Sequence, residues 1–267
     1  MDDDRFAHFR RLHHADRPLL LPNAWDHASA AALVDRGFAA IGTTSLGVAA
    51  AAGLPDGTGA TREQTLALAR GLARLPVPVT VDIEGGFSED PGQVAELAAE
   101  LARAGVAGVN IEDGRADGRL VPVGHQCEVI EAAKQAAPRL FVNARTDTYW
   151  LADAPTGQTL RRAEAYQRAG ADGVFVPGLT DEDTIAGLVR DLDAPLNVLY
   201  APGLSYERLA ESGVARVSTG SLLFRVALHS ALRTACAIAD PAAADPGLPS
   251  YADTQALSLG AWGCAPE

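Results

Sequence analysis

The chain has 267 residues, of which 48% are hydrophobic and 21% charged, a balance typical of a folded globular protein and not of a disordered one. Lysine and arginine number 22 against 34 acidic residues, and the resulting net charge of −12 would repel a nucleic acid instead of attracting it. The length suits one large domain, because single α/β barrels commonly reach about 250 residues.

The sequence favours a protein that stays in the cytoplasm. Its three cysteines, Cys127, Cys236 and Cys264, are too few and too far apart for a disulfide framework or for a zinc site with paired thiolates. The first residues, MDDDRFAHFRRLHHADRP, are charged throughout and lack the apolar core of a secretory signal. The most apolar window, residues 38–55, is interrupted by glycine, threonine and serine, which favours a strand and a loop over a membrane span.

Short runs rich in β-branched residues or leucine alternate along the chain with longer stretches rich in alanine and leucine. Such alternation predicts βα units around a parallel sheet. The predicted strands span residues 19–22, 39–43, 77–83, 108–112, 140–146, 173–177, 196–200 and 215–219. Three of them follow a similar pattern in which a helix ends at glycine before a buried run (RAGVAGVNIE, RAGADGVFVP, ESGVARVSTG). Eight such units close most naturally into a (β/α)8 TIM-type barrel.

The clearest helix is predicted at residues 91–104, with Ser88 or Asp90 as its cap, Pro91 at its first position and Gly105 as its terminator. An open doubly wound sheet is the alternative architecture. It would usually carry a glycine-rich dinucleotide fingerprint after the first strand, where this chain reads LPNAWDHAS. The barrel is therefore the favoured fold.

Two regions are expected, a barrel with its last helix at residues 1–239 and a linker and tail at residues 240–267. The segment DPAAADPGLPS interrupts the helical pattern after Ala239. The tail carries Leu257, Leu259 and Trp262 with few charges, so we expect it to pack on a neighbouring subunit.

Acidic side chains follow neighbouring predicted strands at the points where these strands end. Asp82 and Glu84 are two residues apart and are expected on the same face of one strand, Glu112 ends the next strand, and Asp56 follows the second. Arg145 ends the fifth strand. Because the carboxyl ends of barrel strands meet at one rim, we expect these groups to surround a single cavity.

Several carboxylates in one cavity would repel one another unless a cation neutralised them. Oxygen ligands without histidine or cysteine favour Mg²⁺, with Mn²⁺ as the alternative. Arg145 could then bind a substrate carboxylate through two hydrogen bonds, and the turn Ser45-Leu46-Gly47 could offer backbone N–H groups to an oxyanion. Any one of these acids, taken alone, could equally be a salt-bridge partner or a helix cap.

The ordered motifs TTSLGVAAAAGLPDG, VDIEGGF, GVNIEDG, NARTDTYW and GADGVFVPG resemble the isocitrate lyase and phosphoenolpyruvate mutase superfamily. The resemblance runs from about residue 20 to about residue 227. It implies a (β/α)8 barrel whose last helix, Leu222–Ala239, is exchanged between subunits of a homodimer or homotetramer. It also implies Mg²⁺-dependent cleavage or formation of a C–C or P–C bond in small α-keto or α-hydroxy carboxylates, through a pyruvate-like enolate.

The resemblance also implies roles for single residues. Asp82 resembles the direct metal ligand, while Glu84, Glu112 and Asp56 would hold metal-bound waters. The remaining matches are to substrate-binding positions: Ser45, Leu46 and Gly47 as the oxyanion cradle, Arg145 as the carboxylate clamp, Asn197 as the polar residue of strand seven and Trp25 as an aromatic wall.

The loop after the fourth strand departs from the lyases of this superfamily. Those enzymes carry a lysine-cysteine-glycine-histidine stretch there, whereas this chain reads DGRADGRLVPV. They also place a glutamate after strand six, where this chain has Pro177 and Gly178, and position 84, commonly aspartate in the family, is glutamate. A standard isocitrate or methylisocitrate lyase is therefore not expected.

A metal, an anion clamp and an oxyanion cradle remain, and these suffice for decarboxylation of a β-keto acid such as oxaloacetate. Cleavage of a small 2-hydroxy acid is the next expectation, with Tyr149 or a metal-bound water as base. P–C bond chemistry would need loop cations, for which Arg115 and Arg119 are the candidates. The remaining alternative is a barrel that binds a metabolite without turning it over.

Overall fold

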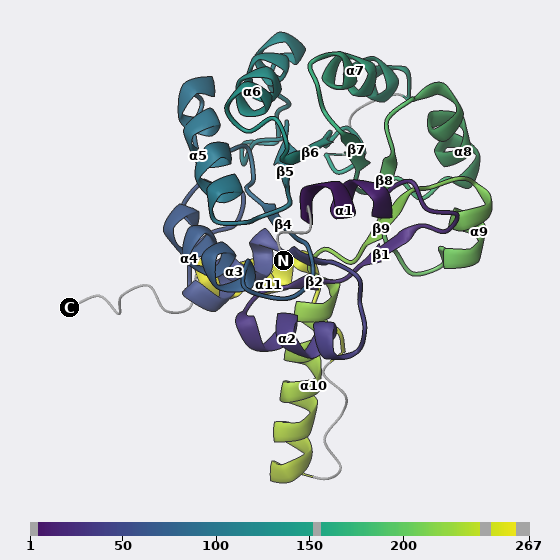
Figure 1. The fold of residues 1–267 in the computed structure, drawn as a ribbon. Coiled ribbons are helices and arrows are strands. Elements are labelled where there is room, and N and C mark those ends of the chain that lie inside the picture. The colour runs from purple at the N-terminus through teal and green to yellow at the C-terminus, as the bar shows by residue number, and fades with distance from the viewer. Residues whose placement is uncertain (1–4, 152–155, 241–246, 260–267) are drawn as a thin grey trace.

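The protein is a closed barrel of parallel strands (Figure 1). The computed structural model describes residues 5–151, 156–240 and 247–259, and its sheet runs in the order β1-β9-β8-β7-β6-β5-β4-β3-β2. The strands are β1 (Leu19–Leu21), β2 (Asn23–Ala24), β3 (Ile41–Thr43), β4 (Val79–Asp82), β5 (Gly108–Glu112), β6 (Phe141–Arg145), β7 (Gly173–Val176), β8 (Leu196–Leu199) and β9 (Arg216–Ser218). The predicted barrel is confirmed.

The ring closes at the first strand. β1 pairs with β9, β2 pairs with β3, and Pro22 alone separates β1 from β2. Proline has no N–H to donate to a neighbouring strand, so the single strand predicted at residues 19–22 is interrupted and continues one position later. The nine short strands therefore occupy the eight strand positions that the sequence predicts.

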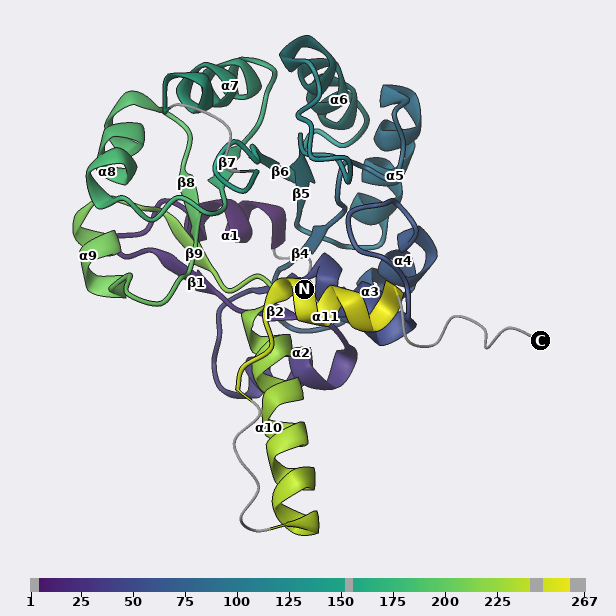
Figure 2. The ribbon, with the colours of Figure 1, turned by 180° about the vertical axis from the view of Figure 1, so that it is seen from behind.

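Helices cover the outside of the ring (Figures 1 and 2). The helices of the described residues are α1 (Arg5–Leu12), α2 (His27–Asp35), α3 (Ser45–Ala52), α4 (Arg62–Leu72), α5 (Pro91–Arg103), α6 (Val123–Ala136), α7 (Thr156–Arg168), α8 (Glu182–Asp191), α9 (Tyr206–Glu211), α10 (Leu222–Ala239) and α11 (Tyr251–Leu259). The helix predicted at residues 91–104 is confirmed as α5, whose cap is Asp90. The Asp90 side chain accepts a 2.8 Å hydrogen bond from the Gly92 N–H.

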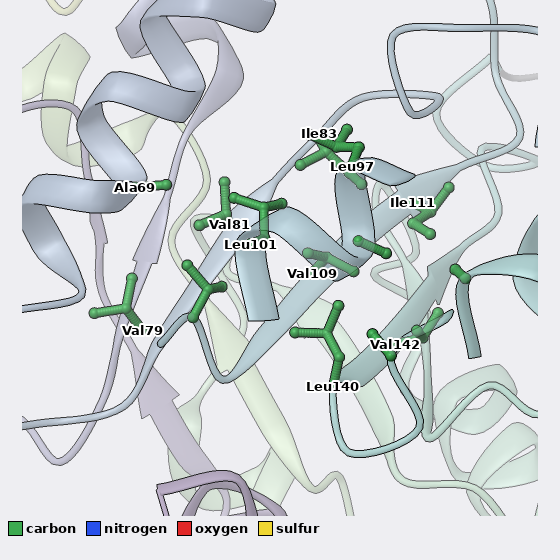
Figure 3. Packing of buried hydrophobic residues seen from close by; sticks show 14 of the residues in the cluster. Ala69, Val79, Val81, Ile83, Leu97, Leu101, Val109, Ile111, Leu140 and Val142 are labelled. Atoms are coloured by element: carbon green, nitrogen blue, oxygen red, sulfur yellow. The ribbon is translucent and has the colours of Figure 1, made fainter. Parts of the chain in front are cut away.

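The apolar core lies between the strands and the covering helices. Val81, Val109 and Ile111 point outward from β4 and β5 and pack with Leu97 and Leu101 of α5 (Figure 3). The alternate residues of the same strands point into the barrel, where polar side chains such as Asn110 and Asn143 are buried and bonded to each other at 2.9 Å. The barrel interior is thus polar, and it leads upward to the acidic strand ends.

Helix α1 closes the bottom of the barrel, a role that the sequence did not reveal. Phe9 and His13 are buried there against Phe141, and the rings of His13 and Phe141 stack with centroids 4.2 Å apart. Gly108 makes room for this contact, because a Cβ at that position would lie 2.8 Å from the Phe9 ring. The N-terminal segment is therefore an integral part of the fold.

Helix α10 projects away from the barrel, as both ribbon views show (Figures 1 and 2). Its apolar side chains Leu232 and Ile238 are 51% and 80% exposed. Within the described residues, α10 is the one helix whose length and composition would suffice to cross a membrane, which is weak evidence for a span. The predicted exchange of this helix between subunits remains a prediction, since the structure holds one chain.

The apolar window at residues 38–55 contains β3 and α3 and not a membrane span. Ser45, Leu46 and Gly47, expected as a turn, instead form the first turn of α3, because the alanine-rich run that follows them continues as a helix. Within the segment expected as a linker and tail, the structure describes α11, which packs against α3 (Figure 2). The side chains of Leu257 and Leu259, and Trp262 and Cys264 altogether, lie outside the described residues.

Candidate active site

A cavity of about 440 Å³ opens at the carboxyl ends of the strands. This is the rim where parallel barrels carry their active sites. Six of the predicted site residues line it: Ser45, Leu46, Asp56, Asp82, Glu112 and Arg145. Six residues that the sequence singled out thus share one cavity, and their roles remain predictions.

Arg145 is held firmly in this cavity. Its Nη1 lies 2.8 Å from Glu112 Oε2, and its Nε donates a 2.6 Å hydrogen bond to Asp147 Oδ1. The guanidinium carbon lies 5.9 Å from the ring centroid of Trp150 and 5.8 Å from that of Phe175, so two aromatic rings flank the charge. Burial acts to lower the pKa of Arg145, but the surrounding carboxylates raise it, so this arginine stays charged.

The carboxylates of the cavity are crowded enough to disfavour full ionisation. Burial raises the pKa of Asp82 to about 6, opposed by Arg145 and assisted by the charge of Asp56. Burial likewise raises the pKa of Glu112 well above its ordinary value, again opposed by Arg145 and assisted by its acidic neighbours. The cavity thus holds more negative charge than Arg145 alone balances.

Asp56 is buried with one of its carboxylate oxygens unpaired. Its Oδ2 accepts a hydrogen bond from the hydroxyl of Tyr251, whereas its Oδ1 has no hydrogen-bond partner. Burial and Asp56 together raise the pKa of Tyr251, which keeps the phenol protonated as the donor. A buried carboxylate oxygen without a partner is unusual and is suited to a cation or to a water molecule bound to one.

The donor set of the cavity fits a hard divalent cation. Asp56, Asp82 and Glu112 supply oxygen atoms, and a cation would relieve the repulsion that raises the pKa of Asp82 and Glu112. Within residues 5–151, 156–240 and 247–259, no three histidine, cysteine or acidic side chains are gathered closely enough to coordinate one ion by themselves. Mg²⁺ commonly keeps several waters and takes only one or two carboxylates directly, so this arrangement suits it.

Glu84 lies elsewhere than expected. Strand β4 ends at Asp82, and the backbone of Glu84 adopts a left-handed conformation with φ of 51°, so the alternation of a strand no longer places the two acids on one face. The Glu84 carboxylate accepts hydrogen bonds from the Gly59 N–H at 2.8 Å and the Thr61 hydroxyl at 2.9 Å. It lines a neighbouring cavity of about 560 Å³, which Glu112 lines as well. Burial raises the pKa of Glu84 to about 7, and the charges of Asp56 and Asp82 assist this rise. Among the described residues, Asp82, Glu84 and Glu112 are not gathered closely enough to coordinate one ion directly, and the water-mediated role of Glu84 remains a prediction.

Three further predicted residues do not line the cavity either. Trp25 packs edge-on against Phe224 of α10, with ring centroids 5.3 Å apart. Gly47, in the first turn of α3, lies against Trp25, from which a Cβ at this position would be 2.8 Å away. Asn197 is buried deeper in the barrel and accepts a 3.2 Å hydrogen bond from Ser218. These residues shape the walls of the site from outside it.

The N-terminus of α3 points its free backbone donors toward the cavity. Ser45 and Leu46 line the cavity, and the first N–H groups of a helix have no partner within it. Thr44, at the cap position, makes no side-chain hydrogen bond to them. The oxyanion role expected for this segment therefore rests on a helix N-terminus, which attracts negative charge.

Asp147, which follows Arg145 by two positions in the sequence NARTDTYW, also lines the cavity. Its backbone N–H donates a 2.8 Å hydrogen bond to Asp113 Oδ1. Asp113 is fully buried, and its Oδ2 accepts from Arg162 at 3.1 Å and from the Tyr166 hydroxyl at 2.7 Å. This buried network fixes the end of β6 and, through Asp147, the position of Arg145.

Cys127 and the proposed base Tyr149 both lie outside the cavity. Cys127 is half-buried on α6, where its thiol contacts the backbone carbonyl of Ala165, and burial raises its pKa. Tyr149 is half-buried and packs on the apolar cluster beneath α7 and α8. Neither side chain is placed to act on a molecule beside Arg145.

Comparison with known proteins identifies the family. Residues 9–239 match the family model described as phosphoenolpyruvate phosphomutase. The chain belongs to this family. An uncharacterized protein of Mycobacterium tuberculosis strain H37Rv is 47% identical over 249 residues, covering 93% of this chain and 95% of that protein. An oxaloacetate decarboxylase of Pseudomonas entomophila is 34% identical over 245 residues, covering 85% and 82%.

The protein also resembles solved structures in its fold. The crystal structure of a proposed phosphonomutase of Burkholderia cenocepacia J2315 matches with a TM-score of 0.80 at 40% identity, covering 89% of this chain and 99% of that one. Phosphoenolpyruvate phosphomutase family members thus include proteins named for C–C and for P–C chemistry. The family relation supports an enzyme and leaves the substrate to be argued from the site.

Proposed function

We propose that the protein decarboxylates a small β-keto acid of the oxaloacetate type. The observation that carries this proposal is a single cavity in which Arg145 stands beside Asp56, Asp82 and Glu112, while no cysteine or histidine of the described chain lines it. A C–C lyase of the isocitrate type uses a loop cysteine as acid, whereas decarboxylation needs no such donor. The oxaloacetate decarboxylase of Pseudomonas entomophila, at 34% identity, supports the same reaction.

The reaction breaks one C–C bond. The C3–C4 bond of the β-keto acid breaks, carbon dioxide leaves, and the electron pair remains as an enolate that water protonates at C3. Arg145 would pair with the C1 carboxylate through Nη2, the nitrogen that is not bound to Glu112 or Asp147, and would hold the substrate in place. The backbone N–H groups of Ser45 and Leu46 would donate hydrogen bonds to oxygen atoms on which negative charge develops. The site thereby stabilises the enolate without an acid-base pair.

We propose Mg²⁺ as the cofactor, with Mn²⁺ as the alternative. Asp82 would hold the ion directly, and Asp56 and Glu112 would hold it through water. The bound ion would supply positive charge beside the keto oxygen of the substrate. Asp56 is suited to this role because its Oδ1 has no other partner.

The P–C alternative finds less support in the loop after β5. Arg119 pairs with Asp117 and is 84% exposed along its side chain, which leaves it far from a shielded phosphoryl group. Arg115 lines the cavity, but its Nε is bound to Glu89 at 2.7 Å and its Nη1 to the Gly114 carbonyl at 2.8 Å. Arg119 is thus held within its own loop, and Arg115 is held by Gly114 and by Glu89 of the loop before α5.

The test is to incubate the protein and Mg²⁺ with oxaloacetate, with phosphonopyruvate or with a substituted malate, and to follow pyruvate and phosphate. Pyruvate from oxaloacetate above the rate with Mg²⁺ alone is the expected result. The variant Arg145→Gln should fall to the metal-only rate, whereas the exposed Arg119→Gln should not. Phosphate release would favour the P–C reaction, and lack of turnover with retained oxalate binding would favour a metabolite-binding barrel.

We further propose that α10 is covered by a second copy of this chain, in a homodimer or homotetramer built by helix exchange. Leu232 and Ile238 are exposed on a helix that leaves its own barrel, and such apolar faces usually mark subunit contacts. Light scattering after size-exclusion chromatography should show an oligomer. The double variant Leu232→Glu, Ile238→Glu should shift it toward the monomer, and the control Arg233→Glu should not. A monomeric wild type would end this proposal.

A further inference from the structure

Four side chains from three parts of the chain form a connected band along the wall of the cavity. The band begins at Arg145, whose guanidinium carbon lies 5.9 Å from the Trp150 ring centroid. The Trp150 and Tyr251 rings meet edge to face with centroids 5.4 Å apart. The Tyr251 hydroxyl then donates a hydrogen bond to Asp56. All four side chains line the same cavity.

Helix α11 brings the C-terminal region of the chain into this band. It packs against α3, Thr254 on it is fully buried, and the Gln255 amide donates a 3.3 Å hydrogen bond to the backbone carbonyl of Asp56. Tyr251 is therefore anchored at its hydroxyl, at its ring and through its helix. Its ring is half-buried and forms a wall of the cavity.

The band has charged side chains at its two ends and aromatic rings between them. Arg145 and Asp56 are charged and belong to the machinery that would bind the carboxylate and the cation, whereas Trp150 and Tyr251 present aromatic surface between them. A substrate that pairs with Arg145 and extends toward the mouth must meet one of these two rings. Two rings in edge-to-face contact leave little freedom for either to yield.

We propose that Tyr251 is a specificity-determining residue, which together with Trp150 limits how far a 2-oxo acid can extend beyond the carboxylate held by Arg145. This inference rests on the proposed binding of a carboxylate at Arg145. It predicts a site that accepts small 2-oxo acids and excludes those with an aromatic ring on C3. The C-terminal helix, and not only the loops of the barrel, thereby selects the substrate class.

The test compares the binding of pyruvate and of phenylpyruvate by calorimetry in the presence of Mg²⁺. Wild type should bind phenylpyruvate at least about tenfold more weakly than pyruvate, since a misfit against packed side chains commonly costs this much. Tyr251→Ala should remove most of this preference by strengthening phenylpyruvate binding. Tyr251→Phe, the matched control, retains the ring and should retain the preference.

Circular dichroism would reveal whether Tyr251→Ala folds. If it does not, Trp150→Ala provides a second variant, because it removes the other ring of the same cavity wall. Trp150 is 38% exposed, so its removal leaves the core intact. An unchanged preference in a folded Tyr251→Ala or Trp150→Ala protein would overturn the inference and leave the decarboxylase proposal standing. If Tyr251→Ala lost the preference for pyruvate over phenylpyruvate while wild type failed to turn over oxaloacetate, the inference would be supported and only the decarboxylase proposal would be overturned. Failure of wild type to bind either acid would overturn both.

Discussion

Arg145 neutralises part of the negative charge of the cavity. Glu112 and Asp147 pair with it at 2.8 and 2.6 Å, and Trp150 and Phe175 flank it with ring faces. A lysine could not replace it, because only a planar guanidinium can use two nitrogens on two carboxylates while lying against aromatic rings. Its single positive charge is shared by two carboxylates, and the buried Arg216 acts on Asp82. Asp56, whose Oδ1 has no hydrogen-bond partner, is the acid that a further cation would serve.

Mutations can distinguish the roles of Asp82 and Glu84 in metal binding. Asp82 faces the cavity beside Arg145, whereas Glu84 is committed to Gly59 and Thr61 around a neighbouring cavity. Asp82→Asn should weaken Mn²⁺ binding by at least about tenfold, since it removes the charge of the proposed direct ligand. Glu84→Gln should leave the affinity near that of wild type. Calorimetric titration with Mn²⁺ measures both, and a larger loss in Glu84→Gln would restore the pairing expected from the sequence.

The predictability of these residues follows from where they stand in the chain. Asp82, Glu112 and Arg145 end their strands, and strand ends are visible in a sequence because an apolar run stops there. Glu84 follows a strand whose alternation ends two residues earlier, which only the backbone conformation reveals. Tyr251 lies 195 residues from Asp56, and no local pattern predicts that contact.

At the scale of elements, the repeated βα pattern predicted the barrel, but it did not predict the short helices α1 and α11 that pack against it. Helix α1 carries three arginines among its eight residues, and its burial of Phe9 depends on the space beside Gly108, far along the chain. Helix α11 follows a segment rich in proline and alanine that suggests only a linker. Both are defined by contacts with distant parts of the barrel and not by their own periodicity.

His13, which is buried at the bottom of the barrel next to α1, should make the stability of the protein sensitive to acid. Burial, with a contribution from the charge of Arg216, lowers the pKa of His13 to about 3, whereas an unfolded histidine titrates near 6.5. Between these values the unfolded chain binds the extra proton, so stability is full above about pH 6.5 and falls as the pH drops toward 3. The loss should approach about 1.4 kcal/mol per pH unit in this window.

Urea unfolding between pH 7 and pH 4.5 measures this effect. The free energy of unfolding of wild type should fall more steeply than that of His13→Gln, whose side chain stays neutral at every pH. His14→Gln serves as the control, because His14 is exposed at the end of the same segment. Equal slopes for wild type and His13→Gln would mean that His13 is not responsible for the acid sensitivity.

At the scale of the whole molecule, the barrel is a ring with one seam. The seam lies where the first strand meets β3 on one side and the last strand on the other, and Asn23 joins all three. Its Oδ1 accepts hydrogen bonds from the N–H groups of Thr219 and Gly220, each at 2.9 Å, and its Nδ2 donates to the Thr43 carbonyl at 2.7 Å. Closure of the ring thus depends on one side-chain amide as well as on strand pairing.

Replacing Asn23 should therefore weaken the whole fold and not only one edge of it. Asn23→Ala removes the partner of two half-buried N–H groups and of one buried carbonyl, which should lower the free energy of unfolding by about 2–4 kcal/mol. Asn23→Asp can still accept from Thr219 and Gly220 but cannot donate to Thr43, so its loss should be smaller than that of the alanine variant. Urea denaturation followed by far-ultraviolet circular dichroism measures both, with the exposed Gln93→Ala on α5 as control. If Asn23→Ala stayed within about 0.5 kcal/mol of wild type, as surface substitutions do, strand pairing alone would hold the seam.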